Sequence, residues 1–104
     1  MTTAVESLEA LHLWLATELP SLRKPDWRKY DYETKERGWV PDVETDGLDG
    51  ALMELGYHVS RAKVNDEYRT LYSWPDDSSR SRMAYGATAH ESACRAARKA
   101  LEAS

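Results

Sequence analysis

The sequence has a single cysteine, no phenylalanine and no long apolar run. Cys94 alone cannot form an intramolecular disulfide, and the first residues lack the basic and apolar regions of a signal peptide. No stretch approaches the roughly 20 apolar residues that a membrane-spanning helix needs. We therefore expect a domain of a reducing, cytoplasmic compartment that does not insert into a membrane.

The chain also lacks a large excess of acidic or basic residues. The net charge is -4, and acidic and basic residues alternate along the chain. This composition does not favour direct binding of nucleic acid, which usually requires a basic surface. The phosphate-binding loops and the nucleophile motif of common enzyme families are absent as well. We expect a protein that is not an enzyme and that carries no cofactor.

Residues that bind metals are few and scattered. Three histidines and the cysteine are available, and only His90 and Cys94 stand at a helical spacing. A structural zinc site normally uses four such ligands at recognisable spacing. The acidic residues between 42 and 49 lack the glycine and glutamate of a calcium-binding loop. From the sequence we predict no metal site.

The composition supports one folded domain over residues 1–104. Hydrophobic residues make up 41% of the chain, which is sufficient for one modest core. Four tryptophans and six tyrosines argue against disorder. The arrangement of the elements below predicts an α+β fold.

Three stretches have the periodicity of amphipathic helices: 3–19, 46–55 and 88–103. Capping boxes are predicted to begin the first and the last, namely Thr3 with Glu6 and Thr88 with Glu91. Thr45 or Asp46 can cap the middle helix. Gly56 stands where a left-handed residue commonly ends a helix.

The remaining regular pattern is a small antiparallel sheet. Residues 57–64 and 67–74 read as a hairpin with a turn at Asn65 and Asp66, and a short third strand is predicted near 82–85. In the second strand, alternation places Tyr72 and Trp74 on the same face. Helices are expected to pack against this sheet.

A long segment at 21–44 shows no period. It is dense in aromatic and charged residues and is bracketed by prolines. We interpret it as an ordered connection without regular secondary structure. Connections of this length in a compact domain usually have a function.

Two motifs are similar to those of a known family. Residues 41–52 (PDVETDGLDGAL) and 86–101 (GATAHESACRAARKAL) resemble the phage ABA sandwich family, and the resemblance covers about residues 39–104. It implies a sheet between helical layers and an accessory gene of a phage or prophage. The family has no settled activity, so it implies no functional residue.

The resemblance implies a phage protein of the bacterial host cytoplasm, and no catalytic motif is present; together these lead us to expect an accessory protein that binds and inhibits a host protein, such as an anti-CRISPR inhibitor of bacterial immunity. Two alternatives remain: an oligomeric sponge that captures a nucleotide signal, and a small enzyme that uses Cys94 with His90. A homo-oligomer also stays open. The candidate binding residues combine aromatic contact area with a small basic spot. They are Trp27, Tyr30, Tyr32, Trp39, Tyr72, Trp74, Arg80 and Arg82.

Overall fold

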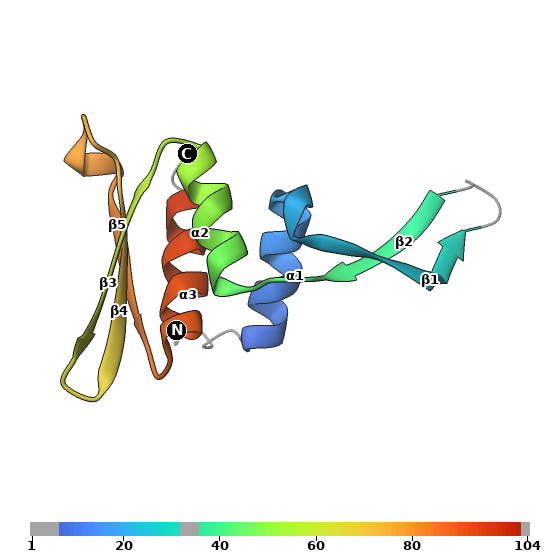
Figure 1. Ribbon diagram of the computed structural model, residues 1–104, viewed down its shortest axis with the longest axis horizontal. Helices are drawn as coiled ribbons and strands as arrows, with labels where there is room; N and C mark the ends of the chain where they lie inside the picture. The colour runs from blue at the N-terminus through green and yellow to red at the C-terminus, as the bar shows by residue number, and fades with distance from the viewer. Residues whose placement is uncertain (1–6, 32–35, 103–104) are drawn as a thin grey trace, which may run out of the picture.

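The computed structural model of the chain describes residues 7–31 and 36–102 (Figure 1). Within these ranges it has an α+β fold, as the sequence predicts. The helices are α1 (Leu8–Glu18), α2 (Thr45–Glu54) and α3 (Ala89–Glu102), with short 3-10 helices η1 (Pro20–Leu22) and η2 (Ser78–Arg80). The strands are β1 (Arg23–Asp31), β2 (Glu36–Pro41), β3 (His58–Val64), β4 (Glu67–Ser73) and β5 (Arg82–Gly86).

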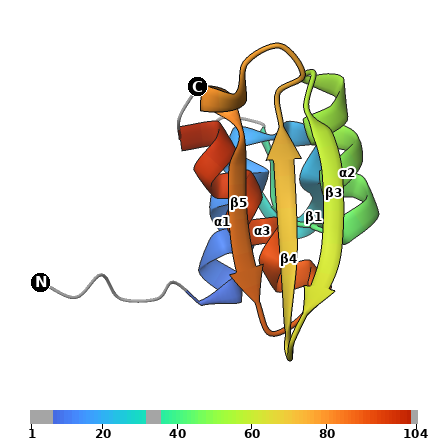
Figure 2. The ribbon, with the colours of Figure 1, turned by 90° about the vertical axis from the view of Figure 1, so that its left-hand side faces the viewer.

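The predicted sheet is confirmed. Strands β3, β4 and β5 form an antiparallel sheet in that order, and Asn65 has a positive φ of 58° in the β3–β4 turn. Helices α2 and α3 lie behind one face of this sheet (Figure 2). On that face, Thr70 and Tyr72 are fully buried. The alternation predicted for this strand is therefore correct.

Capping side chains fix where α1 and α3 begin. The backbone N–H of Glu91 donates to Thr88 Oγ1 at 3.0 Å, and the carboxylate of Glu91 accepts from the N–H of Ala87 at 3.1 Å. This confirms the predicted cap of α3. Helix α1 begins at Leu8, later than predicted, and Ser7 caps it by accepting from the N–H of Ala10. Thr3 and Glu6 lie outside the described residues.

The end of α2 also follows the prediction. Gly56 has a φ of 108°, its N–H donates to the carbonyl of Met53, and the N–H of Tyr57 donates to the carbonyl of Leu52. This bond pair is the Schellman motif, which favours glycine at the left-handed position. A Cβ atom at Gly56 would also lie 2.8 Å from the ring of Trp74. Space and backbone conformation both require glycine here.

Small residues make α3 the centre of the fold. Its alanines Ala93, Ala96, Ala97 and Ala100 are fully buried. One side of the helix contacts β4 and β5, and the other contacts α1 and α2. A stripe without bulky side chains lets α3 sit close to several neighbours at once.

The layer order differs from the one that the family resemblance implies. Figure 1 shows, from left to right, the β3–β4–β5 sheet, then α2 and α3, then α1, and then the β1–β2 pair. The helices therefore lie between two sheets. Among the described residues, no element covers the outer face of the three-stranded sheet (Figure 2).

The segment at 21–44 is not a connection without regular structure, and that prediction is wrong. It forms η1 and an antiparallel pair of strands, β1 and β2, with Arg23 opposite Pro41 and Asp31 opposite Glu36. Its register shifts between Asp26 and Asp31. Trp39 of β2 packs against the core, but a ribbon that otherwise projects from the body need not alternate apolar and polar residues, so periodicity did not reveal it.

We call residues 23–41 the arm. It leaves the body beside α1 and points away from it (Figure 1). The molecule measures 48 × 31 × 29 Å, and its radius of gyration is 15.1 Å. A compact domain of this length has a radius of gyration of about 13 Å. The arm accounts for the elongated shape. No helix in the described ranges has the length and hydropathy to cross a membrane.

Candidate functional site

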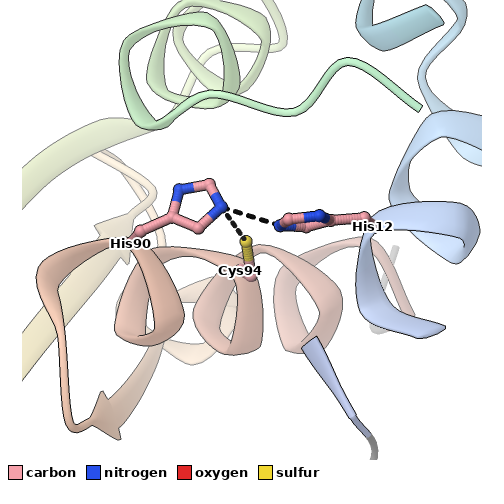
Figure 3. A group of neighbouring side chains, drawn as sticks. All are labelled: His12, His90 and Cys94. Atoms are coloured by element: carbon pink, nitrogen blue, oxygen red, sulfur yellow. Dashed lines mark hydrogen bonds between the residues drawn. The ribbon is translucent and has the colours of Figure 1, made fainter. Parts of the chain in front are cut away.

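Three side chains that can bind metals meet between α1 and α3 (Figure 3). His12 projects from α1, and His90 and Cys94 project from α3. The Nε2 atoms of the two histidines lie 2.7 Å apart, and Cys94 Sγ lies 3.6 Å from His90 Nε2. The ligand atoms of all three residues are within 4.8 Å of one another. We call these residues the His-His-Cys cluster.

The local sequence explains why two of the three residues lie together. His90 and Cys94 are four residues apart, which places both on one face of α3. Their meeting with His12 depends on the packing of α1 against α3. The two imidazole rings meet edge to face, with centroids 4.9 Å apart and an interplanar angle of 70°.

A fourth residue orients the cluster from α2. Thr45 Oγ1 lies 2.8 Å from His90 Nδ1. Thr45 is the first residue of α2, and the N-cap is Glu44, whose side chain makes no capping bond. The sequence predicted Thr45 or Asp46 as the cap, and this prediction is wrong. The hydroxyl of Thr45 instead bonds to the distal nitrogen of His90 and leaves its Nε2 facing the other two side chains.

The electrostatics of the cluster do not favour a nucleophile. Cys94 is fully buried, and its loss of solvent raises the pKa of the thiol to about 12. At neutral pH the sulfur is therefore a neutral thiol, which is a poor nucleophile. Desolvation, followed by the neighbouring His90, lowers the pKa of His12 from its usual 6.5. Its imidazole is thus held in the neutral form, in which it can donate a lone pair.

Tyr72, one of the predicted binding residues, belongs to a buried polar network instead. It is fully buried, and its hydroxyl donates to Asp49 at 2.7 Å. Arg61 binds both carboxylate oxygens of Asp49, at 2.7 and 3.0 Å, and also donates to Thr70. Thr70 in turn shares a 2.7 Å hydrogen bond with Ser92 of α3. The network joins both helices to the sheet, and burial removes Tyr72 from any binding surface.

Trp74, Arg80 and Arg82 stabilise the loop before β5. The Arg80 guanidinium lies 3.8 Å from the centroid of the Trp74 ring. Arg82 Nη1 donates to the carbonyls of Ser79 and Ser81, at 2.6 and 2.8 Å. The predicted basic spot is thus made of two arginines that contact their own chain.

Trp39 lies at the base of the arm. Its ring packs against the core, and the Arg23 guanidinium lies 4.3 Å from the ring centroid. Arg23 also donates to the carbonyls of Ala16 and Thr17, at 2.6 and 2.8 Å, in the last turn of α1. A cation suits this helix end because the unsatisfied carbonyls carry partial negative charge. These contacts fasten the arm to α1.

Two of the other three predicted binding residues belong to the arm. Trp27 and Tyr30 are residues of β1, and Tyr32 lies outside the described residues. The structure therefore divides the predicted set between the body and the arm. The sequence reasoning missed the cluster, because only its i, i+4 pair on α3 could be read and nothing local links it to His12.

No family model, curated protein or solved structure matches this chain. Two features of the geometry bear on function. One is the arm, which projects from a compact body. The other is the His-His-Cys cluster, which lies between α1 and α3.

Proposed function

We propose that this is a non-enzymatic binding protein whose contact surface for a host protein is the arm. The observation that carries the proposal is that, among the described residues, β1 and β2 pair with each other and with no other strand, and that they extend away from the body (Figure 1). An isolated two-stranded ribbon is at best marginally stable in water. A bound partner would stabilise the arm by covering it.

The backbone of the arm is suited to recognising a protein. In a two-stranded sheet, each strand keeps one edge of N–H and C=O groups that no neighbouring strand pairs. An extended segment of another protein can add to such an edge. The outer arm also contains Trp27, Tyr30 and Tyr32 among charged residues. Aromatic side chains give a large contact area at a low cost in conformational entropy.

The base of the arm is preorganised for binding. Arg23 stacks on Trp39 and bonds to the carbonyls of the last turn of α1. In addition, the N–H of Asp42 donates to the carbonyl of Leu22, at 2.7 Å, where the arm returns to the body. Fixing the base before binding reduces the entropy lost on association.

The chemistry of the body supports a binding role over catalysis. Cys94, the one candidate nucleophile, is a buried neutral thiol. The resemblance of residues 41–52 and 86–101 to phage proteins supports a phage accessory protein that works in the host cytoplasm. Inhibition of a bacterial immune protein, as by an anti-CRISPR, is the activity we propose for it. The nucleotide sponge gains no support, since Arg80 and Arg82 contact their own chain.

The test compares two double variants in the bacterial host. In the arm variant, Trp27→Ser and Tyr30→Ser remove two aromatics. In the control, Met83→Ser and Tyr85→Ser change the uncovered face of the sheet, where both side chains are exposed. Native mass spectrometry of each purified protein identifies what remains bound.

We expect wild type and control to retain the same host protein, and the arm variant to lose at least about 90% of it, since removing two interface aromatics costs roughly 2 kcal/mol or more. All three proteins should have melting temperatures within a few degrees of one another. Equal retention by the arm variant would contradict the placement of the contact surface. A retained nucleotide in place of a protein would overturn the proposal in favour of the sponge.

A further inference from the structure

The His-His-Cys cluster has the composition and geometry of a metal site. We propose that His12, His90 and Cys94 bind one zinc ion, which joins α1 to α3. Two imidazole nitrogens and one sulfur form a ligand set that zinc commonly takes in proteins. His12 and His90, whose Nε2 atoms lie 2.7 Å apart, are separated by 78 positions in the sequence. Such a convergence of ligand atoms from distant segments is not produced by local sequence.

One of the three ligand distances already fits a tetrahedral zinc ion, and the other two require movement of the His12 side chain. Zn–N bonds of about 2.0 Å and a Zn–S bond of about 2.3 Å place two nitrogens about 3.3 Å apart and a nitrogen and sulfur about 3.5 Å apart. The Sγ–Nε2 distance between Cys94 and His90 is 3.6 Å, which already fits. The two Nε2 atoms are 2.7 Å apart and would have to separate by about 0.6 Å. The ligand atoms of His12 and Cys94 lie within 4.8 Å of each other, so the half-buried His12 ring has to turn away from His90 and toward Cys94 to bind the ion.

Thr45 is an independent observation that points to the same ligand. Histidines that bind metals almost always make a hydrogen bond through the other ring nitrogen, which fixes the tautomer and the orientation of the ring. The hydroxyl of Thr45 takes this position at His90 Nδ1, 2.8 Å away. It is the first residue of α2, so a third helix orients the site.

The protonation changes balance without another reactant. When the Zn–S bond forms, the thiol proton of Cys94 goes to solvent. In the metal-free cluster one Nε2–H donates to the other Nε2, and on binding that ring carries its proton on Nδ1 instead. Binding of the ion therefore releases one proton, that of the Cys94 thiol. The negative charge of the thiolate neutralises one of the two positive charges of the ion.

Three protein ligands leave one position of the tetrahedron, and water fills it. Within residues 7–31 and 36–102 no further histidine, cysteine or carboxylate belongs to the group. The site is reached from solvent past His12 and His90, which are both partly exposed. Structural zinc sites usually have four protein ligands, and this one differs from them in its open position. We assign it a linking role from its place in the fold: zinc holds α1 on α3, and α1 holds the base of the arm through Arg23.

Cobalt(II) tests the site, because its absorption reports tetrahedral coordination and a bond to thiolate. The purified full-length chain is stripped of metal with a chelator and titrated with Co²⁺. We expect tetrahedral visible bands and a thiolate-to-cobalt charge-transfer band, both saturating at one ion per chain and both abolished by Zn²⁺. Zn²⁺ should also raise the melting temperature as its concentration increases.

The variants separate a site from adventitious binding. Cys94→Ser should abolish the charge-transfer band, and His12→Gln should weaken Co²⁺ binding more than tenfold. His58→Gln is the matched control: His58 is exposed on β3, outside the cluster, and its loss should change nothing. Thr45→Val should weaken binding about 10- to 100-fold, as expected for a residue that orients a ligand, and Thr45→Ser should restore it.

Circular dichroism of each variant establishes whether it is folded. If Cys94→Ser is unfolded, the test rests on His12→Gln. Absence of the charge-transfer band in wild type would overturn the proposal, as would equal weakening by His58→Gln. These readouts require no partner protein. A negative result for the metal site would therefore leave the proposed binding role of the arm unaffected, and a negative result for the arm would leave the metal site unaffected.

Discussion

At the scale of single residues, the network around Asp49 shows how a polar group is kept inside the fold. The carboxylate accepts from both Arg61 and Tyr72, and no buried side-chain nitrogen or oxygen among the described residues lacks a partner. Desolvation, with the hydrogen bond to Asp49 next, raises the pKa of Tyr72 well above its usual 10. Its hydroxyl is therefore a donor throughout the ordinary pH range. Removing one member leaves the rest under-satisfied.

Replacing Tyr72 with phenylalanine should destabilise the protein by about 2 kcal/mol, because the lost hydrogen bond goes to a charged group. Urea unfolding measures the change. Tyr85→Phe is the control: Tyr85 is 43% exposed, and the substitution should cost less than about 0.5 kcal/mol. Equal stability of the two variants would show that the bond to Asp49 contributes nothing.

At the scale of elements, α3 is specified by its own sequence. The predicted cap at Thr88 is observed, and the helix also has a buried alanine stripe and the i,i+4 ion pairs Glu91–Arg95 and Arg98–Glu102. Gly86, just before it, allows the close approach of β5, since a Cβ atom there would lie 2.6 Å from the backbone nitrogen of Ser92.

The first turn of α3 should make stability depend on pH in the acid range. The hydrogen bond from Arg95, and then that from the N–H of Ala87, hold the pKa of Glu91 below its usual 4.5. As pH falls below 4.5, the unfolded chain takes up this proton before the folded one. The contribution of Glu91 is therefore complete above pH 4.5 and is lost as pH falls through the lower folded value.

Glu91→Gln removes this contribution. Unfolding curves measured from pH 6 to pH 3 should show wild type as the more stable protein at pH 6, with the difference shrinking toward pH 3. Curves that stay parallel over this range would contradict the assigned role of Glu91.

Other elements could not be predicted, and the reasons are physical. The three-stranded sheet and the helices bury one face, so their residues alternate with the period of the element. The arm buries little, and its strands left no such pattern. Helix α1 begins at Leu8, later than predicted, because Ser7 caps it, and the sequence pattern did not single out Ser7 as a cap. The cluster needed the packing of α1 on α3, which no local pattern encodes.

At the scale of the whole molecule, the protein is a compact body that presents an arm. The body consists of the three-stranded sheet and three helices, and the described residues extend 48 Å along the axis on which the arm projects. The His-His-Cys cluster lies at the junction of α1 with the body. Zinc bound there would stabilise the attachment of the arm to the helices without being part of the arm's contact surface.

The most direct measurement of the central claim is site-specific photo-crosslinking in the bacterial host. A photoreactive amino acid replaces Arg28, whose side chain on the arm is 93% exposed, or Met83 on the uncovered sheet face. We predict that position 28 crosslinks to one host protein and that position 83 does not. A crosslink from position 83 with none from position 28 would contradict the claim that the arm is the binding surface.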